Sequence, residues 1–405
     1  NHSKTASSKG QHLSVQSHNV GTSKNDVEPL AGSVQELVES LASQGAVALV
    51  NQQLLEEQRR FFQTFIQVIA TAIDEKSPHT SEHCQRVPIL TLMLAEAAAK
   101  IQIGPLKDFS MTDEGREELK VAALLHDCGK ITTPEYVIDK ATKLKTFFDR
   151  IHLIDTRFEV LKRDAEIACL REQLAAQARG ESVDVEAKLA QQIETLNEER
   201  KFLHHCNMGS EFMSDELKKR VLQIAQRQWK TPDGSRENFL SQDEIDNLNI
   251  TKGTLTPDER KIINRHIDTT INMLESLHYP KYLQHVPEYA GGHHEHMDGT
   301  GYPKRLKREQ MSIPARIMGI ADVFEALTSS DRPYNQKPKP LSEALRILGQ
   351  MKKDNHIDPD LFDLFIHEKI YLHYAHSIND KGEPFLTTEQ IDEVDVTQLP
   401  GYNPL

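Results

Sequence analysis

Residues 117–130 read EELKVAALLHDCGK, and this stretch decides the class of fold. Its apolar run VAALL shows no strand-like alternation, which is typical of a helix packed on a core. A second stretch of the same kind, PILTLMLAEAAAK, occupies residues 88–100. Because residues 61–150 continue in this way, with little alternation of β-branched residues, we predict that the whole chain is all-α, a helical bundle.

The first stretch ends in the pair His126 and Asp127. Adjacent helical residues diverge by about 100°, so both side chains can bind one metal only where the chain bends, and Gly129 permits a bend. Upstream, His79 and His83 are four residues apart, a spacing that places two imidazoles on one helical face and suits a shared metal. By itself the pair of His126 and Asp127 is weak evidence for a metal site.

Composition limits the classes of partner. The 405 residues carry 48 basic and 61 acidic side chains, a formal charge of −13, which argues against a surface that binds DNA, RNA or an anionic membrane. There are 19 histidines and four cysteines, without a C-x-x-C pair, which excludes a zinc ribbon. Few thiols and no signal-like or membrane-spanning apolar run predict a reduced, cytoplasmic protein.

The N-terminal part has the pattern of a linker. Residues 1–33 are polar, and we predict a flexible segment that continues from a longer protein. Residues 34–60 have a helical apolar pattern and predict a linker helix. Its segment 37–55, LVESLASQGAVALVNQQLL, resembles the last helix of a GAF sensory domain. An ordinary amphipathic linker or a coiled coil that forms a homodimer is the alternative.

Residues from about 150 to 250 differ in character. Apolar stripes at 167–174 and 189–196 flank ARGESVDVE, where Gly180 ends one helix and Ser182 or Asp184 caps the next. We therefore predict an inserted antiparallel helical hairpin with little chemistry of its own. A capping box at Thr256 and Glu259, with Pro257 between them, predicts a new helix from about residue 257.

Further metal-competent residues follow this insertion. His266 lies on the apolar face of a predicted helix, where a core histidine is the alternative reading. The segment EYAGGHHEHMDGTGYP, residues 288–303, places three histidines between glycines, and a poorly ordered surface loop is its alternative. Asp322 lies within the apolar helix of ARIMGIADVFEAL, where a buried carboxylate needs a partner or a metal. An amphipathic helix is predicted around residues 360–371.

Together, HTSEHCQRV (79–87), HDCGK (126–130), His266, HHEHMDGTGYP (293–303) and IPARIMGIADVFEALTSSDRPY (313–334) resemble the HD-GYP subgroup of HD-domain phosphohydrolases. The resemblance covers about 61–150 and 255–350, and assigns 61–405 to one HD-GYP domain with the insertion. It implies an HD-type helical bundle that holds two or three iron or manganese ions. The implied activity is metal-dependent hydrolysis of cyclic di-GMP to linear pGpG or GMP, by attack of a metal-bridging hydroxide.

The resemblance also implies roles for individual residues. His83, His126, Asp127 and Asp322 would hold one metal, and Asp127 would bridge to a second metal held by His266, His293 and His294. Lys130 and Asp127 would act in catalysis, and the substrate would meet Lys130, Tyr302, Arg316 and Arg332. Trinuclear members carry a glutamate where this chain has His79, so His79 is a candidate ligand of a third metal. A surface lysine is the alternative for Lys130, and structural ion pairs are the alternative for both arginines.

Three functional classes follow. The first is the cyclic dinucleotide phosphodiesterase, acting on cyclic di-GMP or on 3′,3′-cyclic GMP-AMP. The second is a catalytically weak module that senses the dinucleotide or docks a partner. The third is an HD-type phosphohydrolase acting on another nucleotide. The complete set of metal-competent residues favours an enzyme over the binding module.

Overall fold

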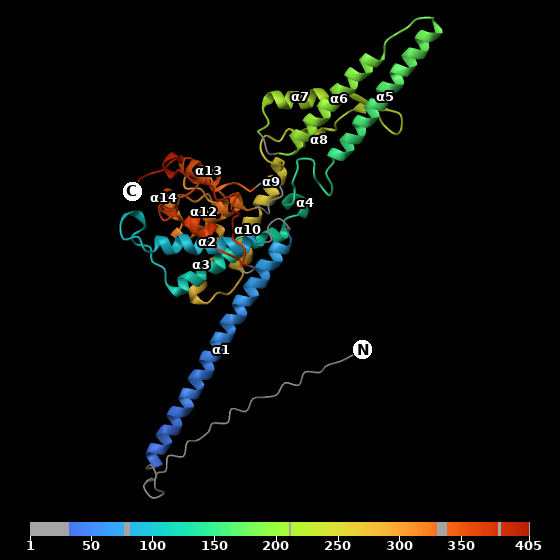
Figure 1. Ribbon diagram of the computed structural model, residues 1–405. Helices are drawn as coiled ribbons and strands as arrows, with labels where there is room; N and C mark the ends of the chain where they lie inside the picture. Colours follow the sequence, from blue (N-terminus) through green and yellow to red (C-terminus); the bar gives the residue numbers. More distant parts are fainter. Residues whose placement is uncertain (1–31, 77–81, 210–211, 330–337, 380–381, 405) are drawn as a thin grey trace, which may run out of the picture. The chain divides into compact units, whose positions relative to one another are not determined.

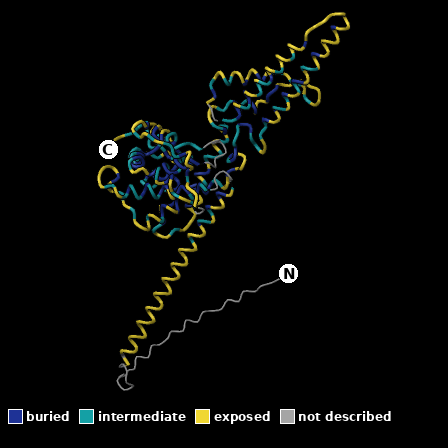
Figure 2. The backbone as a smooth tube through the Cα atoms, viewed as in Figure 1, coloured by how far each residue is buried: buried dark blue, intermediate teal, exposed yellow. Residues whose placement is uncertain are grey.

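The computed structural model describes residues 32–76, 82–209, 212–329, 338–379 and 382–404 (Figure 1). The chain divides into two units, the first ending at Phe62 and the second running from Gln63 to Leu405. Helix α1 (Gly32–Lys76) belongs to both. Its residues 34–61 are exposed, and buried side chains begin at Ile66 (Figure 2). The predicted linker helix is confirmed as a helix, and it continues without a break into the second unit.

Five helices of the second unit form the core around the site. They are α2 (His83–Ala98), α3 (Asp113–Leu125), α10 (His266–Glu275), α11 (Val286–Gly291) and α12 (Ile313–Thr328). Helix α2 packs against α3 and α12, and α11 packs against α3, α10 and α12. The apolar residues of α2 recur at Val87, Leu90, Leu94 and Ala98 and are fully buried, because this spacing keeps them on one face.

The C-terminal helices cover this core. They are α13 (Leu341–Lys353), α14 (Pro359–His367) and α15 (Ile370–Ala375), of which α14 and α15 pack on α2. The prediction of a single helix around residues 360–371 was wrong, because this stretch forms two helices. Lys369 adopts a left-handed conformation with φ 51°, which ends the helical ladder and separates α14 from α15.

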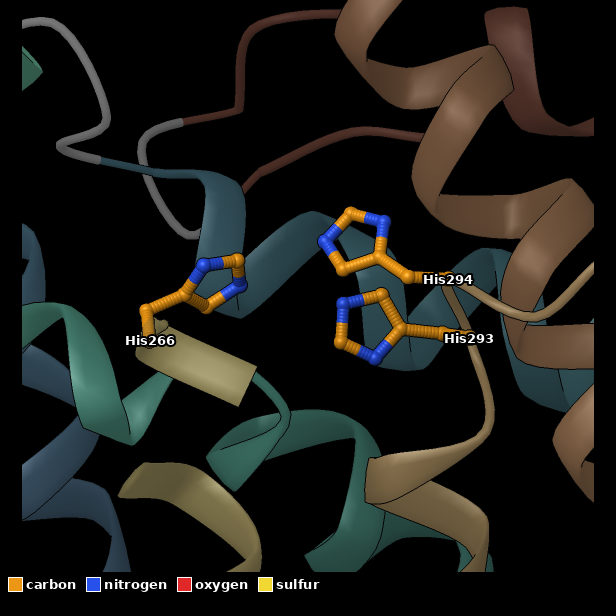
Figure 3. A group of neighbouring side chains, drawn as sticks. All are labelled: His266, His293 and His294. Carbon is orange, nitrogen blue, oxygen red and sulfur yellow. The ribbon is translucent and has the colours of Figure 1, made fainter. Parts of the chain in front are cut away.

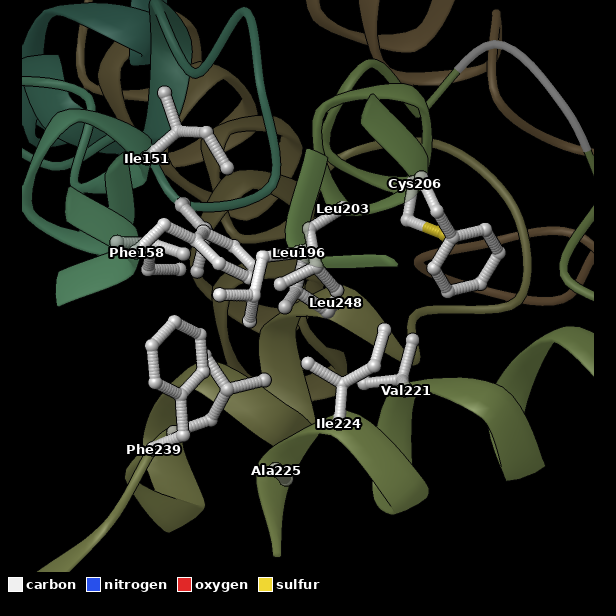
Figure 4. Packing of buried hydrophobic residues seen from close by; sticks show 14 of the residues in the cluster. Ile151, Phe158, Leu196, Leu203, Cys206, Val221, Ile224, Ala225, Phe239 and Leu248 are labelled. Atoms are coloured by element: carbon white, nitrogen blue, oxygen red, sulfur yellow. The ribbon is translucent and has the colours of Figure 1, made fainter. Parts of the chain in front are cut away.

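The inserted segment has a core of its own. It contains α5 (Ile151–Ala178), α6 (Glu186–Asn207), α7 (Asp215–Ala225), a two-stranded antiparallel sheet of β1 (Gln228–Lys230) and β2 (Arg236–Asn238), and α8 (Gln242–Leu248). The predicted hairpin of α5 and α6 is confirmed, but the predicted cap was wrong: Val185 is the N-cap of α6 and no side chain caps it, while Asp184 accepts a hydrogen bond from the Glu186 N–H at 3.2 Å. Phe158, Leu203 and Phe239 are fully buried together (Figure 4). The hairpin is therefore only part of a small packed module.

The remaining elements are short. They are α4 (Glu135–Ile138), α9 (Pro257–Asn264) and the 3₁₀ turns η1 (Gly104–Leu106), η2 (Cys128–Thr132), η3 (Lys281–Leu283), η4 (Arg308–Gln310) and η5 (Val396–Gln398). The capping box predicted at Thr256 and Glu259 is present and begins α9. The all-α prediction is confirmed, since β1 and β2 form the only sheet among the described ranges. No helix in these ranges combines the length and the apolar character needed to cross a membrane.

Candidate metal centre

Four side chains from three helices and a turn form a first cluster. His83 is the first residue of α2, His126 directly follows α3, Asp127 directly precedes η2, and Asp322 lies within α12. Oδ2 of Asp127 lies 3.4 Å from Nε2 of His83 and 3.3 Å from Nε2 of His126. Oδ1 of Asp322 lies 3.2 Å from Nε2 of His83. Two imidazoles and two carboxylates thus converge on one point, as metal ligands do.

Three histidines form a second cluster next to the first. His266 begins α10, and His293 and His294 follow α11 (Figure 3). One ligand atom from each of the three lies within 4.8 Å of the others. Oδ1 of Asp127 lies 3.2 Å from Nε2 of His266. The two oxygens of Asp127 therefore face different clusters, which is the arrangement of a carboxylate that bridges two metals.

Backbone carbonyls fix the orientation of three of these rings. Nδ1 of His126, His266 and His293 lies 2.7, 2.6 and 2.6 Å from the carbonyl oxygens of Ala123, Ile263 and Ala290 respectively. A carbonyl can only accept, so each Nδ1 must carry a proton, and in the neutral ring each Nε2 is left with a lone pair.

Three buried atoms at the centre confirm that a cation fits these donors. Nε2 of His266, Nε2 of His293 and Oδ1 of Asp127 are buried without a hydrogen-bond donor or acceptor of good geometry. Buried polar atoms of this kind are costly unless something satisfies them. Imidazole nitrogens and carboxylate oxygens suit a divalent transition metal, and no cysteine thiolate joins either group.

Glu325 is a functional residue that sequence reasoning missed. It lies on α12 one turn after Asp322, is fully buried, and accepts a hydrogen bond from Nδ1 of His83. Its second oxygen accepts a hydrogen bond from Nε of the buried Arg86 at 2.8 Å. A carboxylate behind a ligand histidine orients the ring and raises its basicity. The signal that identified Asp322, a carboxylate within an apolar helix, applies equally to Glu325.

Charges in the first cluster balance one another. Burial acts against a positive charge on His83, but Glu325, Asp127 and Asp322 together outweigh it, and the pKa of His83 is raised well above its usual value. Burial likewise opposes a charge on His126, yet the contact with Asp127 raises its pKa to about 9. Despite burial, Lys130 and His126 together hold the pKa of Asp127 well below its usual range. Cations thus neutralise buried carboxylates here, and a metal ion would displace the imidazole protons.

In the second cluster, the pKa values of two histidines are lowered instead of raised. Burial, reinforced by His126, lowers the pKa of His293 to about 4. Burial and the neighbouring His293 also lower the pKa of His294 well below its usual value. Both rings are therefore neutral near pH 7, and neutral imidazole is the form that binds metals.

Two predicted substrate residues lie beside the clusters. Nζ of Lys130 lies 2.5 Å from Oδ2 of Asp127, so the lysine is not a free surface residue. The ring of Tyr302 stacks on that of His294, with centroids 4.8 Å apart and an interplanar angle of 20°. Burial raises the pKa of the Tyr302 phenol, which keeps its proton at neutral pH. Both side chains can therefore donate a proton or hydrogen bond to an anion bound at the centre.

The other predicted residues are placed differently. Arg316 donates to the buried carboxylate of Asp358, which also accepts from Arg308, and this favours the structural ion pair over nucleotide recognition. His79 and Arg332 lie outside the described residues. His293 is only 4% exposed, so the alternative of a disordered surface loop was wrong for it. The chain beyond it is held by Glu295, which accepts the N–H groups of Lys304 and Leu306.

Gly129 is needed for a different reason from the predicted bend. A Cβ atom on it would lie 1.9 Å from the His266 carbonyl oxygen and 2.6 Å from the Thr270 nitrogen. Its own N–H donates to Oγ1 of Thr270 at 2.9 Å. The glycine thus lets η2 approach the backbone of α10, which brings Asp127 next to His266.

Two protein families match this chain, and each match contains part of the candidate ligands. Residues 80–237 match the HD domain family, and residues 243–361 match a second family that is also described as an HD domain. The first match contains His83, His126 and Asp127, and the second contains His266, His293, His294 and Asp322. The insertion therefore separates the two ligand sets along the chain.

Curated relatives are similar over shorter stretches. The chain is 36% identical over 121 residues to a cyclic di-GMP phosphodiesterase of Thermotoga maritima, covering 30% of this chain and 32% of the relative. It is 38% identical over 114 residues to one of Pseudomonas aeruginosa, covering 28% and 26%. It is 41% identical over 81 residues to a 3′3′-cGAMP-specific phosphodiesterase of Vibrio cholerae, covering 20% and 18%. The chain spans about a third or less of the length of these relatives.

Proposed function

Because the chain belongs to the HD-GYP group of HD-domain proteins, we propose that it is a metal-dependent phosphodiesterase that hydrolyses cyclic di-GMP. One observation carries the proposal: the Asp127 carboxylate presents one oxygen to each of two ligand clusters. A phosphodiester carries a negative charge that grows at its oxygens during hydrolysis, so two adjacent cation sites suit this substrate.

The ligands divide between two metals. We assign His83, His126, Asp127 and Asp322 to the first and His266, His293 and His294 to the second, with Asp127 shared. Iron or manganese fits this nitrogen and oxygen donor set better than a structural zinc. When bound, such a pair would supply Lewis-acid stabilisation of phosphate charge and would lower the pKa of water. A third metal at His79 remains part of the proposal.

The chain's own residues then act on the phosphate. Lys130 keeps a positive charge beside Asp127, where it can neutralise a phosphate oxygen or the departing 3′-oxygen. Tyr302 stays protonated and can donate its O–H to the phosphate, and we expect its ring and Pro303 to form a wall of the site. Water attacks phosphorus in line and gives up a proton, the P–O3′ bond breaks, and the departing oxygen takes up a proton, so one water is consumed.

A second substrate has a specific observation in its favour. The relative with 41% identity is named a 3′3′-cGAMP-specific phosphodiesterase, so 3′,3′-cyclic GMP-AMP is the second candidate. Arg332 is the remaining candidate for the base contact, since the Arg316 fork is directed at Asp358. Final products, linear pGpG or GMP, are to be identified by the same assay.

Anaerobic assays of Fe- or Mn-loaded protein, with chromatography of the products from both dinucleotides, test the proposal. We expect hydrolysis by the wild type, and a loss of about 1000-fold or more in His126→Ala and Asp127→Ala, together with metal. His204 is a half-buried histidine of the insertion that pairs with Asp155, far from the assigned ligands in sequence, and His204→Ala is the matched control, which keeps both activity and metal. Loaded protein that leaves both dinucleotides intact would refute the proposal.

We further propose a cytoplasmic homodimer joined through α1. Leu37, Leu41 and Leu54 are each more than half exposed on α1, at 58%, 58% and 57%, and a second copy could cover them. All four cysteines are free thiols, which suits a reducing compartment. A monomer in sedimentation at micromolar concentration would contradict the dimer.

A GAF-like sensory module before α1 stays a prediction, as does the absence of binding to DNA or RNA.

A further inference from the structure

The ring of His266 is oriented by the short helix that precedes it. Nδ1 of His266 donates to the carbonyl of Ile263, in the last turn of α9, at 2.6 Å. This bond fixes the tautomer and directs Nε2 at the second cluster. The position of α9 therefore decides where this metal ligand points.

Helix α9 has little apolar contact to hold it in place. None of its eight residues is buried, and its isoleucines are only half-buried. A helix of this length depends on tertiary contacts for its stability. Polar contacts at its N-terminus must supply what apolar packing does not.

Lys140 supplies those contacts. Its side chain is 1% exposed, and Nζ lies 2.8 and 2.7 Å from the two carboxylate oxygens of Glu259 in the first turn of α9. The same carboxylate accepts the Thr256 N–H at 2.8 Å in the capping box. Thr254, just before α9, donates its hydroxyl to the Lys140 carbonyl at 2.7 Å. Lys140 thus binds both the first turn of α9 and the loop segment that precedes it.

The inserted module reaches the same lysine. Asn247 of α8 is 5% exposed, and its Oδ1 accepts a hydrogen bond from Nζ of Lys140 at 2.8 Å. Helix α8 is itself fixed by Glu244, which pairs with both guanidinium nitrogens of Arg157 at 2.8 and 2.9 Å. The ammonium group of Lys140 therefore connects the insertion to the helix that orients His266.

We infer that Lys140 is a positioning residue of the second metal site: through Glu259 it fixes α9, whose Ile263 carbonyl orients His266, and through Asn247 it makes the inserted module a support for that site. The inference rests on the proposed two-metal centre. It gives the insertion a role in metal binding although it supplies none of the assigned ligands.

Lys143 is a matched control within the same loop. It is equally buried, but its Nζ donates to the carbonyls of Leu248 and Ile250 at 2.9 Å each and not to α9. Lys140→Met and Lys143→Met therefore remove the same charge from similar surroundings. Only the first change releases Glu259.

Titration of the metal-free full chain with Mn²⁺, followed by electron paramagnetic resonance, tests the assignment. Two adjacent Mn²⁺ ions couple, whereas a single ion gives an uncoupled signal. In Lys140→Met we expect the first ion to bind as in the wild type and the second about tenfold more weakly, the lower end of the range for outer-shell changes. Lys143→Met should bind both ions as the wild type does.

Glu259→Gln keeps a capping residue at this position and removes only the charge, so it guards against misfolding of the lysine variant. We expect it to weaken Mn²⁺ binding at the second site too. The double variant Lys140→Met, Glu259→Gln should bind the second ion no more weakly than Lys140→Met alone, because the two residues act as one unit. Asn247→Ala should weaken the same site by a smaller factor.

Wild-type affinity at both sites in Lys140→Met would overturn the assignment, as would an equal loss in Lys143→Met. If Asn247→Ala leaves both Mn²⁺ affinities unchanged, the inserted module does not support the second metal site. Wild-type protein that binds no second Mn²⁺ would instead overturn the proposed function, and this inference with it. The measured quantity is an affinity, so neither result depends on turnover.

Discussion

At the scale of single residues, one carboxylate connects the two halves of the site. Asp127 faces His126 and His83 with one oxygen and His266 with the other, and Lys130 lies against it. Its position follows from the end of α3, where the backbone leaves the helix and turns into η2. A buried carboxylate in such a place is stable only among cations.

Glu325 gives the first prediction at this scale. Replacing it with glutamine removes the charge behind Nδ1 of His83. We expect affinity for the first metal to fall about 10–100-fold, the range for residues that orient ligand histidines. A Mn²⁺ titration measures this fall.

Glu244→Gln is the matched control. Glu244 is also a buried carboxylate paired with an arginine, but it belongs to the insertion and touches no ligand. Its replacement should lower stability and leave the affinity for the first metal unchanged. Equal affinities in both variants would show that Glu325 does not orient His83.

At the scale of elements, the site depends on how closely η2 approaches α10. Gly129 makes this possible, since a Cβ atom would collide with the backbone of His266 and Thr270. Backbone atoms cannot move aside as a flexible side chain can, so the two elements would have to separate.

Gly129→Ala should therefore cost up to about 3 kcal/mol in the free energy of unfolding, the usual cost of overpacking a core. It should also weaken metal binding, because Asp127 and His266 lie on the two elements that separate. Urea denaturation and Mn²⁺ titration measure the two effects.

Gly45→Ala in α1 is the comparison. A Cβ atom there has no neighbour within 4 Å, and alanine favours a helix over glycine. This variant should be neutral or slightly more stable. A Gly129→Ala protein that behaves in the same way would contradict the steric account.

At the scale of the whole molecule, the second unit contains two packed regions. The helices around the site form one, and the inserted module, with Phe158, Leu203 and Phe239 at its centre, forms the other. Lys140 and Lys143 lie in the loop that joins them and bind the insertion through polar groups.

Lys143 predicts how stability depends on pH. Burial lowers its pKa from 10.5 to about 8. Between pH 8 and 10.5 the unfolded chain holds the proton and the folded chain does not, so stability contributed by this group rises with pH. The slope is at most about 1.4 kcal/mol per pH unit, the value for one proton.

Urea denaturation at several pH values compares the wild type with Lys143→Met. The stability of the wild type relative to the variant should increase as pH rises through this window. Lys219→Met, an exposed lysine of the same module, should give no such change. A constant difference between wild type and Lys143→Met would contradict the prediction.

The sequence predicted much of the fold because helical periodicity and caps are local signals. The helices at 88–100 and 117–125, the capped start of α9 and the hairpin of the insertion are all present. The break at Lys369 and the small sheet were missed, since each depends on the conformation of a few residues that no periodic pattern marks.

The sequence by itself determined which residues could bind metal, because imidazole and carboxylate side chains can be read directly along the chain. It also determined the helical class. Only the tertiary structure decided that Asp127 lies between both clusters, that Glu325 supports His83, that Arg316 pairs with Asp358, and that Lys140 holds α9. The physical reason is that these contacts join residues 42 to 242 positions apart, and such distances are set by packing and not by any local pattern.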